Sequence, residues 1–249
     1  MLASTSVLAV LGAPPTVPAA FTAIVTLNTS GTIPGLTPSG VTVKYMMQYD
    51  LANRRLRKDT CQQHSCTSNI LRFDENISPP PHPQPGEPTK PMPVGYQFRT
   101  ETRDHCCWLW LFDPDTSTAE KMNAIQIPPT AADLGPDKGH GGAKHWQLAL
   151  MFPFTSISDY WTDANGTLVQ NDNFVGFGAR GGVLSKSTYR NVVPGPIDVS
   201  NFAHPDLSEC KQFGKDHECD ASDAAELLAA HKSLYIPSPP PRRNLHQIS

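Results

Sequence analysis

The sequence predicts an all-β protein with one C-terminal helix. Segments that alternate apolar and polar residues, many of them β-branched, recur between turn residues, which is the pattern of half-buried strands. The 249 residues include 25 prolines, and only 17% are charged, against roughly 25% in average globular domains. Few charges and many prolines favour a loop-rich extracellular β protein over a helical cytosolic enzyme.

The first elements follow this pattern. Residues 1–20 form an N-terminal segment whose apolar core is too short for a signal peptide, so we expect any signal to lie upstream. Residues 21–31 alternate as one strand, and residues 41–60 predict a hairpin that turns at "DLAN". The returning segment "RRLRKD" is expected to face its charges to water, and residues 69–76 form another short strand.

A proline-rich stretch divides the chain. "SPPPHPQPGEPTKPMP", residues 78–93, predicts a polyproline-like surface loop, because proline cannot donate ladder hydrogen bonds. Two strands follow, joined by a polar turn near Arg103 and Asp104. The second, "CWLWLF", is apolar throughout, which is typical of a strand covered on both faces in a sandwich or half-barrel. We therefore expect it to be buried.

The C-terminal half ends in the predicted helix. "HWQLALMFPF" is another apolar strand, Asn165-Gly166 predicts a hairpin turn, and "NFVGFGARGGVLSKSTYRNVV" indicates strand, glycine turn and strand. "ASDAAELLAAHKSL" predicts a helix at about 222–234, because its apolar residues share one face. We expect a β domain over residues 21–210 and an extension over residues 211–249, which ends in a proline-rich tail.

The cysteines indicate an oxidising compartment. Their number is even, which predicts disulfides among Cys61, Cys66, Cys106, Cys107, Cys210 and Cys219. Sequons for N-glycosylation begin at Asn28, Asn76 and Asn165 and agree with a secreted glycoprotein. A net charge of −3 argues against nucleic-acid binding. The sequence contains no run of 18 apolar residues, so we expect no transmembrane helix.

Two patterns are weak signals for other chemistry. Residues 176–181 match G-x-G-x-x-G, with Asp198 further on, but prolines interrupt the position where a helix must follow, so we interpret the segment as a flexible β-turn. His140 and His145 lack a third zinc ligand and a glutamate base at recognisable spacing, so we interpret them as a polar loop before a strand. A hydrolase that uses both histidines with an unidentified carboxylate stays an alternative, because triads assemble in space.

Several segments, taken in order, resemble those of ependymin-related proteins. They are "YMMQYDLANRRLRKD", "GYQFRTETRDHC", "IQIPPTAADLG" with "GGAKHW", and "DVSNFAHPDLSEC", and the similarity spans about Phe21 to Cys210. The resemblance implies two stacked, strongly curved antiparallel sheets (a half-barrel or sandwich), like the bacterial lipoprotein carriers of the LolA type. It also implies secretion, or residence in the lumen of a lysosome or vacuole, a deep apolar pocket for lipid, calcium in some members, and a homodimer or larger extracellular assembly.

The adjacent Cys106 and Cys107 are predicted to bond different partners. A bond between neighbours closes a strained ring, and their side chains point to opposite faces of a strand. The resemblance implies Cys210 for one of them, because the family's final cysteine returns to the middle of the domain. For the other we expect Cys61 or Cys66, and the thiol left over would pair with Cys219 or stay free.

These features predict a non-enzymatic secreted domain that binds an apolar ligand, such as a lipid, between curved sheets. The expected pocket lining is aromatic and consists of Trp108, Trp110, Trp146, Phe152, Phe154 and Tyr160. The alternative is a structural or adhesive subunit of an extracellular assembly, which would use the proline-rich loop, the helix and the tail. A large open apolar cavity would favour ligand binding.

Overall fold

The computed structural model describes residues 13–31, 40–62, 65–83, 87–111, 125–150, 155–176, 181–213 and 219. The expected helix at about 222–234, the tail after it and most of the N-terminal segment lie outside these ranges. Within them, no helix is long and apolar enough to cross a bilayer.

Strands dominate the described part of the chain, which confirms the all-β class. In chain order they are β1 (Ala20–Gly31), β2 (Val41–Asp50), β3 (Arg55–Gln62), β4 (Ser65–Ile77), β5 (Met92–Arg99), β6 (Cys107–Trp110), β7 (Ala132–Asp137), β8 (Ala143–Leu150), β9 (Thr155–Thr162), β10 (Leu168–Gly176), β11 (Gly182–Pro194) and β12 (Lys211–Gln212). They hydrogen-bond in the order β12-β6-β5-β4-β3-β2-β1-β11-β10-β9-β8-β7, where the sequence suggested two stacked sheets.

The chain forms two compact units that alternate along the sequence. Unit 1 comprises residues 1–17, 29–39 and 126–187, and unit 2 comprises residues 18–28, 40–125 and 188–249. The β domain expected at residues 21–210 therefore contains parts of both units.

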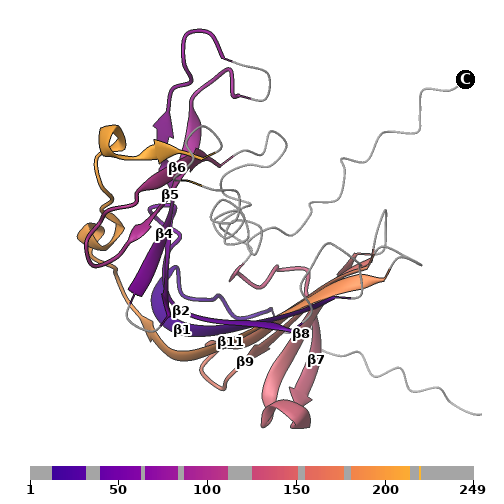
Figure 1. Ribbon diagram of the computed structural model, residues 1–249. Helices are drawn as coiled ribbons and strands as arrows, with labels where there is room; N and C mark the ends of the chain where they lie inside the picture. The colour runs from indigo at the N-terminus through magenta and orange to yellow at the C-terminus, as the bar shows by residue number, and fades with distance from the viewer. Residues whose placement is uncertain are drawn as a thin grey trace, which may run out of the picture. The chain divides into compact units, whose positions relative to one another are not determined.

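Unit 2 is built on the antiparallel meander from β2 to β6, and β12 runs parallel to β6. Two 3-10 turns, η4 (Val199–Phe202) and η5 (Leu207–Glu209), lie against one face of this meander (Figure 1). Phe202 of η4 is fully buried in a core with Ile70, Val94 and Tyr96. Burial of a side chain of this size is worth about 1.5–3 kcal/mol, so the turns are part of the core of unit 2.

In the charged segment "RRLRKD" only Arg54 is exposed, and Lys58 and Asp59 are buried, so the prediction that its charges face water is wrong for most of the segment. Arg57 donates from Nε to Asp59 at 2.8 Å and from Nη1 to the backbone oxygen of Asn201 at 2.6 Å. The side chains of Arg57 and Asp59 are only 14% and 7% exposed. The sequence could not reveal this, because the η4 turn that covers the strand lies 144 residues further along the chain.

All six cysteines are paired, and all lie in unit 2. Cys106 bonds Cys210, as the resemblance implied, and its neighbour Cys107 bonds a different partner, Cys219. The expectation that Cys61 or Cys66 would bond one of the neighbours is wrong, because these two bond each other. They face each other across the β3–β4 hairpin with Cα atoms 4.0 Å apart.

The segment "CWLWLF" begins at these disulfides. Its first residue, Cys107, and its fifth, Leu111, are buried, as is the preceding Cys106, and its last residue, Phe112, lies outside the described residues. Trp108 and Trp110 of β6 are half-buried and touch edge to face, with ring centroids 4.9 Å apart. The expected burial therefore holds for Cys107 and Leu111, and the two tryptophans keep part of their surface accessible.

Unit 1 is built on the antiparallel strands β7 to β10 and the first residues of β11 (Figure 1). The hairpin predicted at Asn165-Gly166 is confirmed: Gly166 has a φ of +80°, and Asp163 accepts hydrogen bonds from the backbone N–H groups of Asn165 and Thr167. β7 was not predicted. Its sequence "ADLGPD" contains glycine and proline, which are tolerated because β7 is an edge strand with an irregular register.

Candidate functional site

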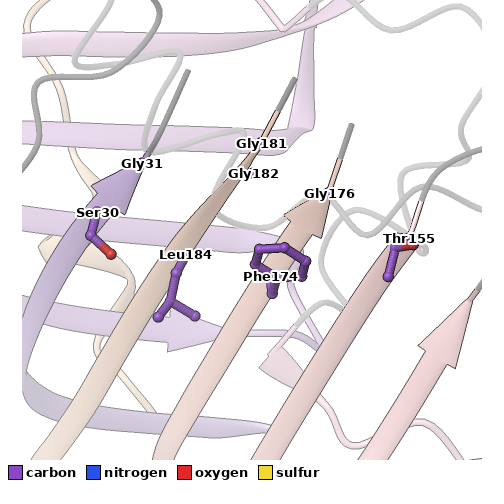
Figure 2. A pocket seen from close by; sticks show the side chains of 8 residues that line it. All are labelled: Ser30, Gly31, Thr155, Phe174, Gly176, Gly181, Gly182 and Leu184. Atoms are coloured by element: carbon purple, nitrogen blue, oxygen red, sulfur yellow. The ribbon is translucent and has the colours of Figure 1, made fainter. Parts of the chain in front are cut away.

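An open cavity of about 530 Å³ lies in unit 1, where β1 and β10 end and where β9 and β11 begin. Figure 2 shows the side chains of Phe174 and Leu184 on neighbouring strands beneath it, with Ser30 and Thr155 on the flanking strands. The other lining residues are glycines, namely Gly31, Gly176, Gly181 and Gly182. Small-molecule sites span roughly 300–1,000 Å³ and are mostly apolar, so the cavity has the size and the lining of such a site.

The glycines shape the cavity because they leave room for the ring of Phe174. A Cβ atom at Gly182 would lie 2.5 Å from Cε2 of Phe174 and 2.9 Å from the backbone oxygen of Val175. A Cβ atom at Gly176 would lie 3.0 Å from Cε1 of the same ring. Any side chain at Gly182 would therefore displace the ring that forms the cavity floor.

Strand alternation places charged side chains on the same face of unit 1 as the cavity, two residues along each strand. Asp172 precedes Phe174 by two positions in β10, and Lys186 follows Leu184 by two positions in β11. Nζ of Lys186 lies 3.4 Å from Oδ2 of Asp172, so the two side chains share this face. We call it the cavity face.

The charges of the cavity face form one row across four strands. In β8, Nε2 of His145 lies 2.7 Å from Oδ1 of Asp159 in β9. Asp159 is the direct cross-strand partner of Asp172 in β10, and Asp172 pairs with Lys186 in β11. We call these four residues the charged row. Its two carboxylates are neighbours, and like charges directly opposite each other destabilise a sheet.

Burial is the main influence on the pKa of Asp172, whose side chain is 14% exposed. Burial raises the pKa of this carboxyl group above its ordinary value, and the charge of Asp159 raises it further. The hydrogen bond from Gln170 and the charge of Lys186 offset part of the rise. A carboxyl group that is unfavourable to ionise, next to an apolar cavity, is a combination found at functional sites.

His140 and His145 meet at Trp161, although the sequence predicted only a polar loop. Both imidazole rings stack on the indole, with ring centroids 4.1 and 4.6 Å away. Oδ2 of Asp137 accepts a hydrogen bond from Nε1 of Trp161 at 2.9 Å and lies 2.7 Å from Nδ1 of His140. The bonds from Trp161 and then His140 lower the pKa of Asp137 to about 2.

A hydrolytic or metal site would need further groups around these imidazoles. His140 bonds Asp137 and His145 bonds Asp159, and neither imidazole bonds a hydroxyl or thiol among the described residues. The described ranges also contain no group of three His, Cys, Asp or Glu residues that could hold a metal ion. The calcium implied by the resemblance stays a prediction.

The aromatic residues predicted to line a pocket are distributed over both units. Trp146 and Tyr160 are direct cross-strand partners in unit 1, are almost fully buried, and lie on the sheet face opposite the cavity face. Trp108 and Trp110 belong to β6 in unit 2, and Phe152 and Phe154 lie outside the described residues. None of the four described aromatics is among the residues that line the 530 Å³ cavity.

Phe174 and Leu184 were absent from the predicted pocket. The available signal was the glycine density of "NFVGFGARGG", because glycine within strands marks close approach of a neighbouring group. The glycine pattern that we interpreted as a β-turn thus has a steric role in this structure, since Gly176 and Gly181 both border the cavity.

Comparisons with known proteins assign no family. No family model matches the chain, and no curated protein matches it. Among solved structures, the chain is similar to a LolA superfamily protein from Nitrosomonas europaea, with a TM-score of 0.31 and 9% identity over 75% of this chain and 90% of that chain. We draw no conclusion about fold or function from a similarity at this TM-score. The resemblance to ependymin-related proteins stays a prediction, and the fold class rests on the strands of this chain.

Proposed function

We propose that this chain is a non-enzymatic secreted glycoprotein that binds an apolar ligand, such as the acyl chain of a lipid, in the cavity over Phe174. The observation that carries the proposal is the cavity itself, with its apolar side chains at the strand ends. Leu184 is 37% exposed, so apolar surface stays in contact with water until a ligand covers it. Covering such surface is favourable by about 25 cal/mol per Å².

The disulfides and the sequons support secretion. Three disulfides are typical of proteins that mature in an oxidising compartment. Asn28, Asn76 and Asn165 have exposed side chains, which attachment of a glycan requires. Expression in a eukaryotic secretory host, followed by enzymatic removal of N-glycans, is expected to shift the mass of the protein. Secretion without glycans would contradict the glycoprotein part of the proposal and leave ligand binding untouched.

The open apolar cavity is also the feature that we expected to separate ligand binding from the adhesive alternative. An adhesive subunit would use the proline-rich loop, the helix and the tail, and the last two lie outside the described residues. We therefore retain ligand binding as the proposed function.

Binding of a neutral long-chain probe tests the proposal. Dodecanol titrated into the full chain is expected to bind, and native mass spectrometry of protein from its natural source is expected to show a co-purifying lipid. Leu184→Trp fills the cavity and should weaken dodecanol binding by about tenfold or more, a loss of about 1.4 kcal/mol.

Leu134→Trp is the matched control, because Leu134 is 51% exposed and belongs to β7, away from the cavity lining. It should bind dodecanol like the unmodified chain. Absence of both a co-purifying lipid and dodecanol binding would overturn the proposed function.

A further inference from the structure

We propose that the ligand of this cavity is a cationic amphiphile, a long-chain amine whose ammonium group binds at Asp159 and Asp172 while its apolar chain covers Phe174. The inference rests on the proposed function and adds the chemical class of the ligand. It follows from the position and the charge balance of the charged row.

The charged row lies within reach of a molecule seated in the cavity. Residues two positions apart in a strand are separated by about 6.8 Å, which is the Cα distance expected from Phe174 to Asp172. In the neighbouring strand β9, Ile157 pairs with Phe174 and Asp159 pairs with Asp172. Each strand therefore presents an apolar side chain and then a carboxylate in the same direction. An amphiphile that lies along the strands would place its chain on the first pair and its head group on the second.

The charge balance of the row favours a positive head group. Asp159 and Asp172 are two carboxylates, and Lys186 is the only permanent cation of the row, because His145, whose Nε2 lies 2.7 Å from Asp159, is charged only when protonated. One negative charge is thus in excess. Lys186 is 42% exposed, and its Nζ lies 3.4 Å from Oδ2 of Asp172, so a ligand ammonium can approach the carboxylates without removing a buried partner.

The same geometry disfavours an anionic head group. A carboxylate or phosphate at this place would be a third negative charge beside two that already oppose each other across β9 and β10. The nearby amide donors do not compensate, because Gln147 already donates to Asp159 and Gln170 already donates to Asp172. An ammonium group accepts the two carboxylates as partners and relieves their repulsion.

A bare divalent cation fits this place less well. Calcium takes six to eight oxygen ligands, whereas the neighbour of this carboxylate pair is the imidazole of His145, and no group of three His, Cys, Asp or Glu residues among the described residues could hold a metal ion. The adjacent apolar surface of Phe174 would also have no function in metal binding.

Three probes of equal chain length test the head-group preference. Isothermal titration calorimetry of the full chain with dodecylamine, dodecanol and dodecanoate, each below its solubility limit or micelle concentration, is expected to rank them in that order of affinity. Hydrogen bonds between charged groups are stronger than those between neutral groups, so the amine should bind at least about tenfold more tightly than the alcohol. High salt should reduce this advantage.

Asp172→Asn keeps the shape of the side chain and removes its charge, so it should cancel most of the preference for the amine over the alcohol. Asp133→Asn is the matched control, because Asp133 pairs with Lys144 at 2.9 Å on β7 and lies outside the cavity lining. It should preserve the preference. Asp159→Asn serves as a second variant in case Asp172→Asn does not fold.

The outcomes separate the two proposals. Equal affinity for amine and alcohol, or an amine preference that survives both aspartate substitutions, would overturn the cationic ligand. If Leu184→Trp still weakens dodecanol binding in that case, the cavity function stands. Failure of all three probes to bind would overturn both proposals.

Discussion

Asp74 in unit 2 and Asp172 in unit 1 are both part-buried carboxylates on sheet strands, 16% and 14% exposed, yet their partners differ. Asp74 accepts hydrogen bonds from Nε of Arg55 at 2.7 Å and of Arg72 at 2.8 Å. Burial alone would raise the pKa of Asp74, but the bonds and charges of the two arginines outweigh it and lower the pKa. Asp172 has one lysine and faces Asp159, and burial raises its pKa.

The difference reflects what each carboxylate is connected to. Arg72 also donates to the backbone oxygen of Phe202, and it pairs with Glu75, which bonds Tyr96 and His204. This network joins β3, β4 and β5 to the C-terminal segment of unit 2. The charged row joins only strands that are already neighbours in the sheet. Charges with surplus partners stabilise the fold, whereas charges with too few partners beside a cavity are available to a ligand.

Reduction of the disulfides is expected to produce the largest difference in stability between the two units, with unit 2 losing more than unit 1. Cys106–Cys210 and Cys107–Cys219 have sequence separations of 104 and 112, and a loop of about 100 residues contributes about 4.7 kcal/mol in the chain-entropy model. Unit 1 contains no cysteine. Hydrogen exchange after reduction should therefore accelerate more in β4–β6 than in β8–β10. Equal acceleration in both sets of strands would contradict the contrast.

Replacement of Asp74 should lower the free energy of unfolding more than replacement of Asp172 in the charged row. Asp74→Ala leaves Arg55 and Arg72, both 17% exposed, without their shared carboxylate, and we expect a loss of about 3 kcal/mol. Asp172→Ala is the matched change in unit 1, and it should cost less than about 1 kcal/mol because it also removes a repulsion. Urea unfolding of both variants measures the difference. Similar losses would show that the two carboxylates have equivalent roles.

Gly182→Ala tests the floor of the cavity. The new Cβ atom would lie 2.5 Å from the ring of Phe174 and 2.9 Å from a backbone oxygen, and overpacking of this kind costs about 1–3 kcal/mol. We expect lower stability together with weaker dodecanol binding. Gly176→Ala, with its closest approach at 3.0 Å, should have the same effects to a smaller degree. A Gly182→Ala protein that binds normally would exclude Phe174 from the ligand site.

Acidification should change the stability contributions of Asp74 and Asp172 in opposite directions, and this is the smallest expected effect. The folded pKa of Asp74 lies below its ordinary value of 3.8, so its stabilisation is present above that value and is lost as the pH falls through the lowered pKa. The folded pKa of Asp172 lies above 3.8, so its ionisation costs stability as the pH rises through that range, and acidification restores it. Carboxyl ¹³C NMR titration should place the two midpoints on opposite sides of 3.8.

The sequence by itself determined what depends on neighbouring residues. The strand at residues 21–31, the Asn165-Gly166 hairpin and the different partners of the adjacent cysteines were all predictable, because alternation, turn chemistry and ring strain act over a few positions. The disulfide between Cys61 and Cys66 was missed because it depends on the pairing of β3 with β4. The burial of "RRLRKD" was missed because a distant turn covers it.

The candidate site was decided by the tertiary structure. No local pattern says that Asp159 lies opposite Asp172, or that Gly182 lies beneath the ring of Phe174. Both follow from strand register, which long-range hydrogen bonding and core packing determine, and a shift of one residue would send every side chain of a strand to the other face. The aromatic residues of unit 1 were predictable as buried, but the face that each one occupies was not. For this reason Trp146 and Tyr160 entered the core while Phe174 and Leu184 formed the cavity.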